Sequence, residues 1–124
     1  MRLIRTMIYI MVIIYAEIDV DPAGQHETLA NSVAFANESL GERGCIGYLF
    51  TLDSQKPGLM YVLERWENDE DLEAHMHTAR SADFAKWMTG VARKVRVNRY
   101  TVSDDKSDSF RQASTELMGD SVET

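Results

Sequence analysis

One histidine and one tryptophan are the residues of this sequence best suited to carry chemistry. Trp66 ends a predicted strand, and His75 lies on the helix expected to follow it. On a helical wheel His75 falls about 60° from Leu72, at the edge of the apolar stripe, so it can point into the domain. There it would be either a proton acceptor near neutral pH or a half-buried histidine bonded to a carbonyl. His77 falls on the far side, so the two histidines do not converge on a metal ion.

The aromatic side chains allow two interpretations. Trp66 is expected first of all to pack in the core, and it could also form a flat wall for an aromatic ligand. Glu64 shares its strand face, and a structural hydrogen-bond acceptor is the favoured role for it. Tyr48 and Phe84 belong to an aromatic and methionine-rich set, typical of a core or of an adaptable pocket for a planar apolar ligand.

Common cofactor signatures are missing from the sequence. It contains no glycine-rich phosphate loop, no Gly-x-Ser-x-Gly motif and no dinucleotide fingerprint. Cys45 is the single cysteine, which excludes an internal disulfide and a multi-cysteine metal site. We therefore expect no metal and no cofactor, and a reducing cytoplasm as the compartment.

The elements that must position these residues follow the order β-α-β-β-α-β. Strands are predicted over 8–20, 45–52, 59–66 and 94–102. This order is the ferredoxin-like α+β plan, with both helices on one face of the sheet. The other face is left apolar and uncovered, and a second copy of the chain is the expected cover, giving a homodimer.

Capping signals place the helices. Asp21 and Pro22 predict the start of the first helix, and Asn68 caps the second, which restarts near 81–83. Gly41 is expected to end the first helix. Phe35 falls off its apolar stripe, so it is either exposed or faces a pocket or partner. The predicted stripe consists of Leu29, Val33, Ala36 and Leu40.

The length and net charge of the chain limit the number of domains and the classes of partner that it can have. The 124 residues fit one domain, and the net charge of −7 argues against nucleic-acid binding. A domain over 8–102 is followed by a polar tail, 103–124, predicted to be mobile with at most a short helix near Glu116. A basic run is interpreted as a solvated face, a partner for the acidic tail or an anion-binding rim. It consists of Arg93, Lys94, Arg96 and Arg99.

The N-terminal segment resembles a signal peptide at first sight. Arg2 and Arg5 precede an apolar run over 7–16. The run is shorter than the about 20 residues that span a bilayer, and no small-residue cleavage site follows. A buried first strand is the favoured interpretation, without membrane association.

A series of short segments over about 8–102 carries a family resemblance. These read IYAEI followed by PAG, then ERGCIGY, VLERWE and LEAH, and end at Phe84. In this order they resemble the antibiotic-biosynthesis-monooxygenase domains, which include small quinol monooxygenases. The resemblance implies a dimeric α+β barrel that oxygenates aromatic polyketides or quinols without flavin, haem or metal.

The family also holds haem-degrading enzymes and isomerase-like sugar-phosphate enzymes. Many members carry a second histidine soon after the first, and here the segment 78–84 has none. The haem-degrading branch uses a histidine and an asparagine where Met88 or its neighbours and Glu17 stand here, so haem degradation is disfavoured.

The leading hypothesis is a cofactor-independent monooxygenase that oxidises a hydroxylated aromatic or quinol with O2. His75 would accept the phenolic proton, with Trp66, Tyr48 and Phe84 around the substrate. An ordinary phenol and an ordinary imidazole differ by about 3.5 pKa units, roughly 5 kcal/mol, so a hydrogen-bond donor to the phenolate is needed. Tyr48 or Arg80 is expected to supply it. The alternative is a non-oxygenase: a dimeric ligand-binding domain, or an isomerase acting on a small metabolite, including an anionic one.

Overall fold

The computed structural model describes residues 11–123, and its sheet has the predicted topology. The four strands are β1 (Met11–Val20), β2 (Cys45–Leu52), β3 (Leu59–Trp66) and β4 (Ala92–Val102). They lie in the order β2-β3-β1-β4, and every neighbouring pair is antiparallel. This confirms the ferredoxin-like α+β fold. The predicted start of the first strand, over 8–10, lies outside the described residues.

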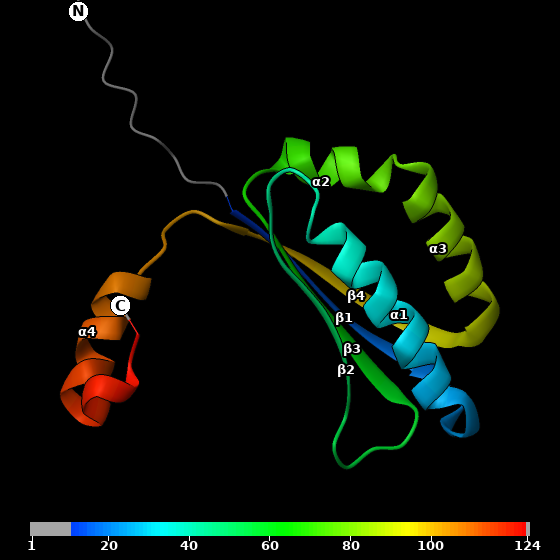
Figure 1. The fold of residues 1–124 in the computed structure, drawn as a ribbon, viewed down its shortest axis with the longest axis horizontal. Helices are drawn as coiled ribbons and strands as arrows, with labels where there is room; N and C mark the ends of the chain where they lie inside the picture. The colour runs from blue at the N-terminus through cyan, green and yellow to red at the C-terminus, as the bar shows by residue number, and fades with distance from the viewer. Residues whose placement is uncertain (1–10, 124) are drawn as a thin grey trace, which may run out of the picture.

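Three helices cover one face of this sheet. They are α1 (Gln25–Ser39), α2 (Asp69–Met76) and α3 (Ala79–Val91), and Figure 1 shows them all on the same side of the strands. The core lies between the two layers, where Val12, Met60 and Trp66 have no exposed surface. Burial of this apolar surface is the main stabilising contribution to the domain.

Side-chain caps fix where the helices begin. Asp21 caps a short 3-10 helix, η1 (Pro22–Gly24), which leads into α1. Asn68 caps α2, with its Oδ1 accepting from the backbone N–H of Asp71 at 2.8 Å. Both caps were predicted. Thr78 caps α3 by accepting from Ser81 N–H at 3.1 Å, so the helix restarts at Ala79, two residues earlier than expected.

The buried side of α1 differs from the predicted stripe. Ala36 is buried as expected, but Leu40 is 45% exposed and Phe35, which falls off the stripe, is buried. Ser32 and Ser39 are completely buried because each hydroxyl donates to the carbonyl four residues earlier, at 2.8 and 2.9 Å. The stripe was wrong at Leu40 because these satisfied serines occupy the inner side.

The hairpin of β2 and β3 has the predicted bounds, with one irregularity. The register shifts between Cys45 and Gly47. Ile46 is therefore exposed, although strict alternation places it beside Tyr48 and Phe50 in the core. Beyond the shift, Tyr48 and Phe50 are buried as expected.

The second face of the sheet carries apolar side chains and no helix of the domain. Tyr15 of β1 pairs with Leu63 of β3 and Asn98 of β4, and Leu63 pairs with Leu49 of β2, so these side chains share that face. Leu49 is exposed and Leu63 is half-buried. An apolar centre of this kind is the surface that a second copy would cover.

The tail forms a longer helix than predicted. After β4 ends at Val102, α4 runs over Ser107–Met118 and is followed by η2 (Gly119–Ser121). The Asp105 carboxylate accepts from Ser107 N–H at 2.9 Å, and the twelve residues of α4 include no glycine or proline. Figure 1 shows α4 standing apart from the sheet and the other helices. No helix within 11–123 has the length and apolar character needed to cross a bilayer.

Candidate functional site

His75 lies in the last turn of α2 and points into the domain. It is only 6% exposed, and its ring centroid lies 4.8 Å from that of Trp66. His77, two residues on, has a side chain that is 78% exposed. The two histidines therefore take the opposite positions predicted for them.

Trp66 forms the floor beneath His75. The indole is completely buried, and its N–H donates to Glu64 Oε1 at 3.0 Å. The core-packing role favoured for Trp66 and the acceptor role favoured for Glu64 are thus both present. Trp66 lines neither of the two hollows that His75 borders.

Burial sets the protonation of the groups around this floor. Burial raises the pKa of Glu64, and the hydrogen bond from Trp66 partly opposes that shift. Burial, followed by the nearby Glu64 carboxylate, raises the pKa of Tyr48. Tyr48 therefore remains a neutral phenol at physiological pH, beside the Glu64 carboxyl.

A carboxylate that the sequence did not reveal contacts His75. Glu42 lies in the loop between α1 and β2, and its Oε1 makes a short hydrogen-bond contact with His75 Nδ1. Its second oxygen, Oε2, accepts from Arg80 Nη2 at 3.0 Å. The only sequence signal for Glu42 was its place in the ERGCIGY segment.

Arg80 is directed towards the end of α1. Its Nη1 donates to the carbonyl of Phe35 at 3.2 Å, its Nη2 donates to Ser39 Oγ at 3.0 Å, and its guanidinium lies 4.4 Å from the Phe35 ring centroid. These contacts engage the guanidinium with the protein itself. The substrate-binding role predicted for Arg80 stays a prediction, and its contacts favour a role in holding Glu42.

An aromatic pocket opens beside His75. It has a volume of about 210 Å³. Phe84 stacks on Phe35 with ring centroids 4.0 Å apart, and the Tyr48 ring stands edge-on to His75 at 5.5 Å. The structure thus brings together three of the predicted site residues, His75, Tyr48 and Phe84. The lining consists of Phe35, Tyr48, His75, Met76, Ser81, Phe84 and Ala85.

Ser81 is a pocket residue that sequence reasoning missed. Its Oγ lies 3.5 Å from His75 Nε2 and 2.7 Å from the His75 carbonyl oxygen, to which it donates. Since Ser81 lines the aromatic pocket and Glu42 does not, the ring presents its Nε2 edge towards that pocket. The three-residue spacing between Thr78 and Ser81 is the capping signal that could have located this hydroxyl.

The family model for antibiotic biosynthesis monooxygenases matches residues 11–87 of the chain. The matched segment contains Glu42, Trp66, His75 and Arg80, and it covers more than half of the sequence. The chain belongs to the antibiotic biosynthesis monooxygenase family.

Solved structures of several bacterial proteins share the fold of this chain. A conserved Bacteroides thetaiotaomicron protein of unknown function, suggested to be an oxidoreductase, aligns with a TM-score of 0.71 at 22% identity over 76% of this chain and 99% of its own. A Deinococcus radiodurans protein assigned provisionally to the antibiotic biosynthesis monooxygenases gives 0.71 at 18% identity over 76% and 94%. A Nitrosomonas europaea protein with the same provisional assignment gives 0.65 at 14% over 72% and 95%. A search of curated proteins gave no match.

A second hollow lies on the other side of His75 in this family member. It measures about 420 Å³ and is lined mainly by polar side chains, including Glu42, Glu70 and Asp71. These acidic groups make this hollow less suited than the aromatic pocket to an anionic or planar apolar ligand. Within residues 11–123, no group of three histidine, cysteine or acidic side chains is placed to hold a metal ion.

The basic run on β4 is engaged in ion pairs. Arg96 binds Asp19 at 2.9 Å, Arg93 lies 3.5 Å from Asp21, and Arg99 pairs with Asp69 of α2. Three of the four basic residues are therefore neutralised within the domain. This leaves little basic surface for the acidic tail or for an anionic ligand.

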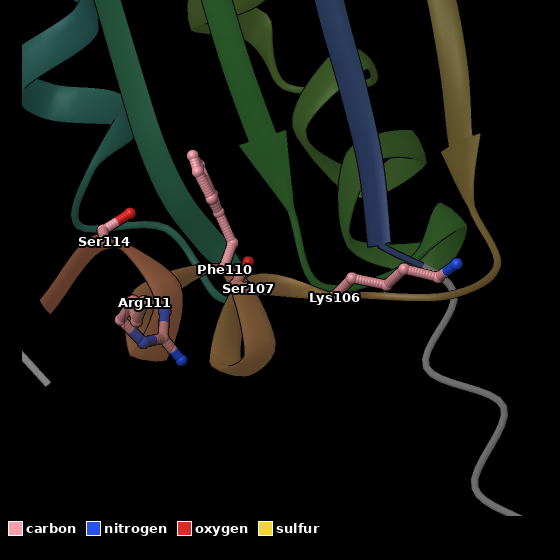
Figure 2. A pocket seen from close by; sticks show the side chains of 5 residues that line it. All are labelled: Lys106, Ser107, Phe110, Arg111 and Ser114. Carbon is pink, nitrogen blue, oxygen red and sulfur yellow. The ribbon is translucent and has the colours of Figure 1, made fainter. Parts of the chain in front are cut away.

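A further hollow follows the tail helix. It measures about 670 Å³ and is lined by tail residues alone, which are Lys106, Ser107, Phe110, Arg111 and Ser114. Figure 2 shows Phe110 and Ser114 extending on the same side of α4. With no lining residue from the α+β domain and no acid–base pair among its members, this space lacks the features of an active site.

Proposed function

We propose that this protein is a cofactor-independent monooxygenase that oxidises a hydroxylated aromatic or a quinol with O2. The observation that carries the proposal is the buried His75, with Nδ1 bound to Glu42 and the Nε2 edge turned towards an aromatic pocket. A general base for a phenol must reach the hydroxyl proton while its ring is held in place. The family assignment is consistent with this chemistry.

The pocket suits a small planar substrate. Its volume of about 210 Å³ lies below the about 300–1,000 Å³ of sites for drug-sized ligands. A compound of one or two rings would fill it, lying against Phe84 and Tyr48.

The proposed reaction is balanced without an external reductant. His75 Nε2 accepts the phenolic proton, and the electron-rich anion transfers an electron to O2. After radical recombination, one oxygen atom enters the ring and the other leaves as water. A hydroquinone then becomes a hydroxyquinone, with all four electrons drawn from the substrate.

Ser81 is the proposed donor to the developing phenolate. Of the two donors expected from the sequence, Arg80 is bound to Glu42 at 3.0 Å, and Tyr48 is a buried phenol beside the Glu64 carboxyl. The Ser81 hydroxyl lies beside Nε2 and donates only to the His75 carbonyl, so it can turn to a substrate oxygen. A donor aimed at the site of developing charge lowers the cost of proton transfer.

Glu42, His75 and Ser81 also form a carboxylate–histidine–hydroxyl series, as in the catalytic triads of acyl-transfer enzymes. The nearby helix amides argue against that chemistry. Ser81 N–H is bound to Thr78 Oγ1 and Ala82 N–H to the Thr78 carbonyl, so neither is available for an oxyanion. Monooxygenation makes no demand on these amides.

The non-oxygenase alternative has less support. An isomerase or binding domain for an anionic metabolite would need a free basic rim, and Arg93, Arg96 and Arg99 are already paired. The aromatic lining favours a planar, largely apolar ligand in its place. O2 uptake separates the two functions.

We also propose that the protein works as a cytoplasmic homodimer in which the open sheet face meets that of a second copy. The support is the apolar centre of that face, around Tyr15, Leu49 and Leu63. Its small aromatic substrate and O2 would be the other partners. Nucleic acid is not expected as a partner because the chain is acidic. A membrane is not expected because the apolar run over 7–16 is shorter than a bilayer span.

The direct test is O2 consumption with a series of naphthohydroquinones. We expect uptake well above the rate without protein, and a loss of about 10²–10⁴-fold in the His75→Ala variant. His77→Ala is the matched control, because His77 lies two residues away and is exposed. Uptake no faster than the blank across all quinols would refute the monooxygenase, and full activity in His75→Ala would remove His75 from it.

A further inference from the structure

We infer that Glu42, anchored by Arg80, is a positioning residue that holds His75 in the Nδ1–H tautomer and so leaves Nε2 as the proton acceptor. The inference assigns a task to two residues of the site and rests on the proposed function only for its catalytic consequence. Its physical core, the location of one proton on one ring, stands independently of which substrate the pocket takes.

Glu42 carries a negative charge. Arg80 donates to Glu42 Oε2 at 3.0 Å, and a guanidinium is always protonated. Glu42 therefore acts as a carboxylate, which can only accept hydrogen bonds. Its Oε1 contacts His75 Nδ1, so the proton between these two atoms belongs to the imidazole.

A proton on Nδ1 leaves the other ring nitrogen of His75, Nε2, free to accept one. In a neutral imidazole one nitrogen carries a proton and the other an accepting lone pair. With Nδ1 protonated, the lone pair lies on Nε2, which is the nitrogen 3.5 Å from Ser81 Oγ in the aromatic pocket. Glu42 thus decides which edge of His75 accepts a proton, in the way that outer carboxylates orient histidine ligands and bases.

Arg80, which anchors Glu42, is itself held in place by several contacts. Arg80 is held by the Phe35 carbonyl, by Ser39 Oγ and by stacking on the Phe35 ring. All three contacts come from the last turns of α1, which therefore positions Arg80 and, through it, Glu42. The side chains of Arg80 and Glu42 are 29% and 23% exposed, so solvent only partly screens their interaction.

Glu42→Gln gives a sharp prediction because Arg80 remains. The glutamine oxygen must face the Arg80 donor, which leaves the glutamine NH2 facing His75 Nδ1. Nδ1 must then accept, and the ring proton moves to Nε2. We expect kcat to fall by about 10²–10⁴-fold with little change in KM, since the acceptor in the pocket is lost while the pocket is not.

The tautomer can be read directly, without substrate. Long-range ¹H–¹⁵N spectra of the ¹⁵N-labelled full chain at about pH 8 distinguish a protonated from an unprotonated ring nitrogen, and His75→Gln assigns the signals. We expect protonated Nδ1 and bare Nε2 in the wild type, and the reverse in Glu42→Gln. Adding Arg80→Met to Glu42→Gln frees the amide to turn its oxygen to His75, and we expect the wild-type pattern to return.

Several results would overturn the inference. These are a wild-type ring protonated at Nε2 or at both nitrogens, or a Glu42→Gln spectrum unchanged from wild type. The wild-type spectrum alone is decisive if a variant fails to fold. Glu73→Gln is the matched control, since Glu73 pairs with the exposed His77 and should leave His75 unaffected. A reversed tautomer without O2 uptake in any form would refute the proposed function and leave this inference intact.

Discussion

Glu64 is a carboxyl group enclosed between Trp66, Tyr48 and the inner side of the sheet. Burial raises its pKa, and the indole N–H that it accepts from opposes the rise. A raised pKa means that the folded protein binds this proton more tightly than the unfolded chain does. Stability therefore declines as the pH rises from the unfolded pKa, about 4.3, towards the raised folded value.

Glu64→Gln should remove that dependence on pH. The glutamine oxygen can still accept from Trp66. Any pH-independent effect of the substitution on the unfolding free energy cancels when the values at two pH values are subtracted. We expect the wild type to lose stability relative to Glu64→Gln between pH 4 and pH 7.5, as measured by urea unfolding. Glu67→Gln, at an exposed position, controls for loss of a surface charge. If the wild type and Glu64→Gln differed in unfolding free energy by the same amount at both pH values, the raised pKa of Glu64 would be contradicted.

At the residue scale, the sequence predicted correctly those positions that helical periodicity alone determines. His75 and His77 were separated correctly by helical periodicity alone. For Phe35 the sequence left two alternatives, exposure or a place facing a pocket or partner, and the structure shows that it lines the aromatic pocket. Glu42 was not found, because its position depends on Arg80, which lies about 40 residues away in the chain. Contacts of this range leave no periodic pattern in a single sequence.

Among the connecting elements, the turn between α1 and β2 bears most directly on the site. Gly44 lies there at φ +77°, two residues after Glu42, and its carbonyl accepts from Glu67 N–H at 2.8 Å. A Cβ atom at this position would meet the Asp71 side chain, including its Cβ at 2.6 Å. The turn therefore needs glycine for both its conformation and its close approach to α2.

Gly44→Ala should destabilise the domain by about 1–3 kcal/mol, from the left-handed conformation and the contact with Asp71. Gly90→Ala is the matched control within α3, because nothing lies within 4 Å of its added Cβ. There we expect a gain of about 0.5–1 kcal/mol, the usual helix preference for alanine. Thermal or urea unfolding measures the stability change of each variant. Equal changes in Gly44→Ala and Gly90→Ala would contradict a special requirement for glycine at position 44.

Element-scale prediction was strongest where side-chain caps and turns mark the ends. The hairpin bounds and the caps Asp21 and Asn68 were correct. The inner side of α1 was not, because Ser32 and Ser39 satisfy their hydroxyls within the helix and can be buried like small apolar residues. The tail helix was underestimated because its stabilisation is local and its polar composition resembles a flexible segment.

At the scale of the whole molecule, the two faces of the sheet differ. One is covered by α1, α2 and α3, while the other presents Tyr15, Leu49 and Leu63 beside the ion pairs of Arg96 with Asp19 and Glu17. An apolar centre with a charged margin is the pattern of a protein–protein interface. The α4 helix, apart from both faces in Figure 1, contributes little to this arrangement.

Leu63→Lys should dissociate the proposed dimer. Two-fold symmetry would bring the new charges together at the centre of the interface, where like charges cost several kcal/mol, so we expect the dissociation constant to rise at least about 100-fold. Sedimentation velocity over a concentration series measures it. Val97→Lys is the control, since Val97 pairs with Ala16 and lies on the helix side, where it is 63% exposed. A monomeric wild type would refute the dimer.

The central place of β1 between β3 and β4 has a consequence for the nascent chain. β1 is synthesised first, but its partners begin only at Leu59 and Ala92. Until those residues leave the ribosome, the apolar segment MVIIYA has no partner strand in the described chain and is prone to self-association. The β2–β3 hairpin, joined by six residues, is expected to form first, and β1 to be captured on it. Folding of this domain during translation should therefore be completed late, when β4 closes on a strand made some 80 residues earlier.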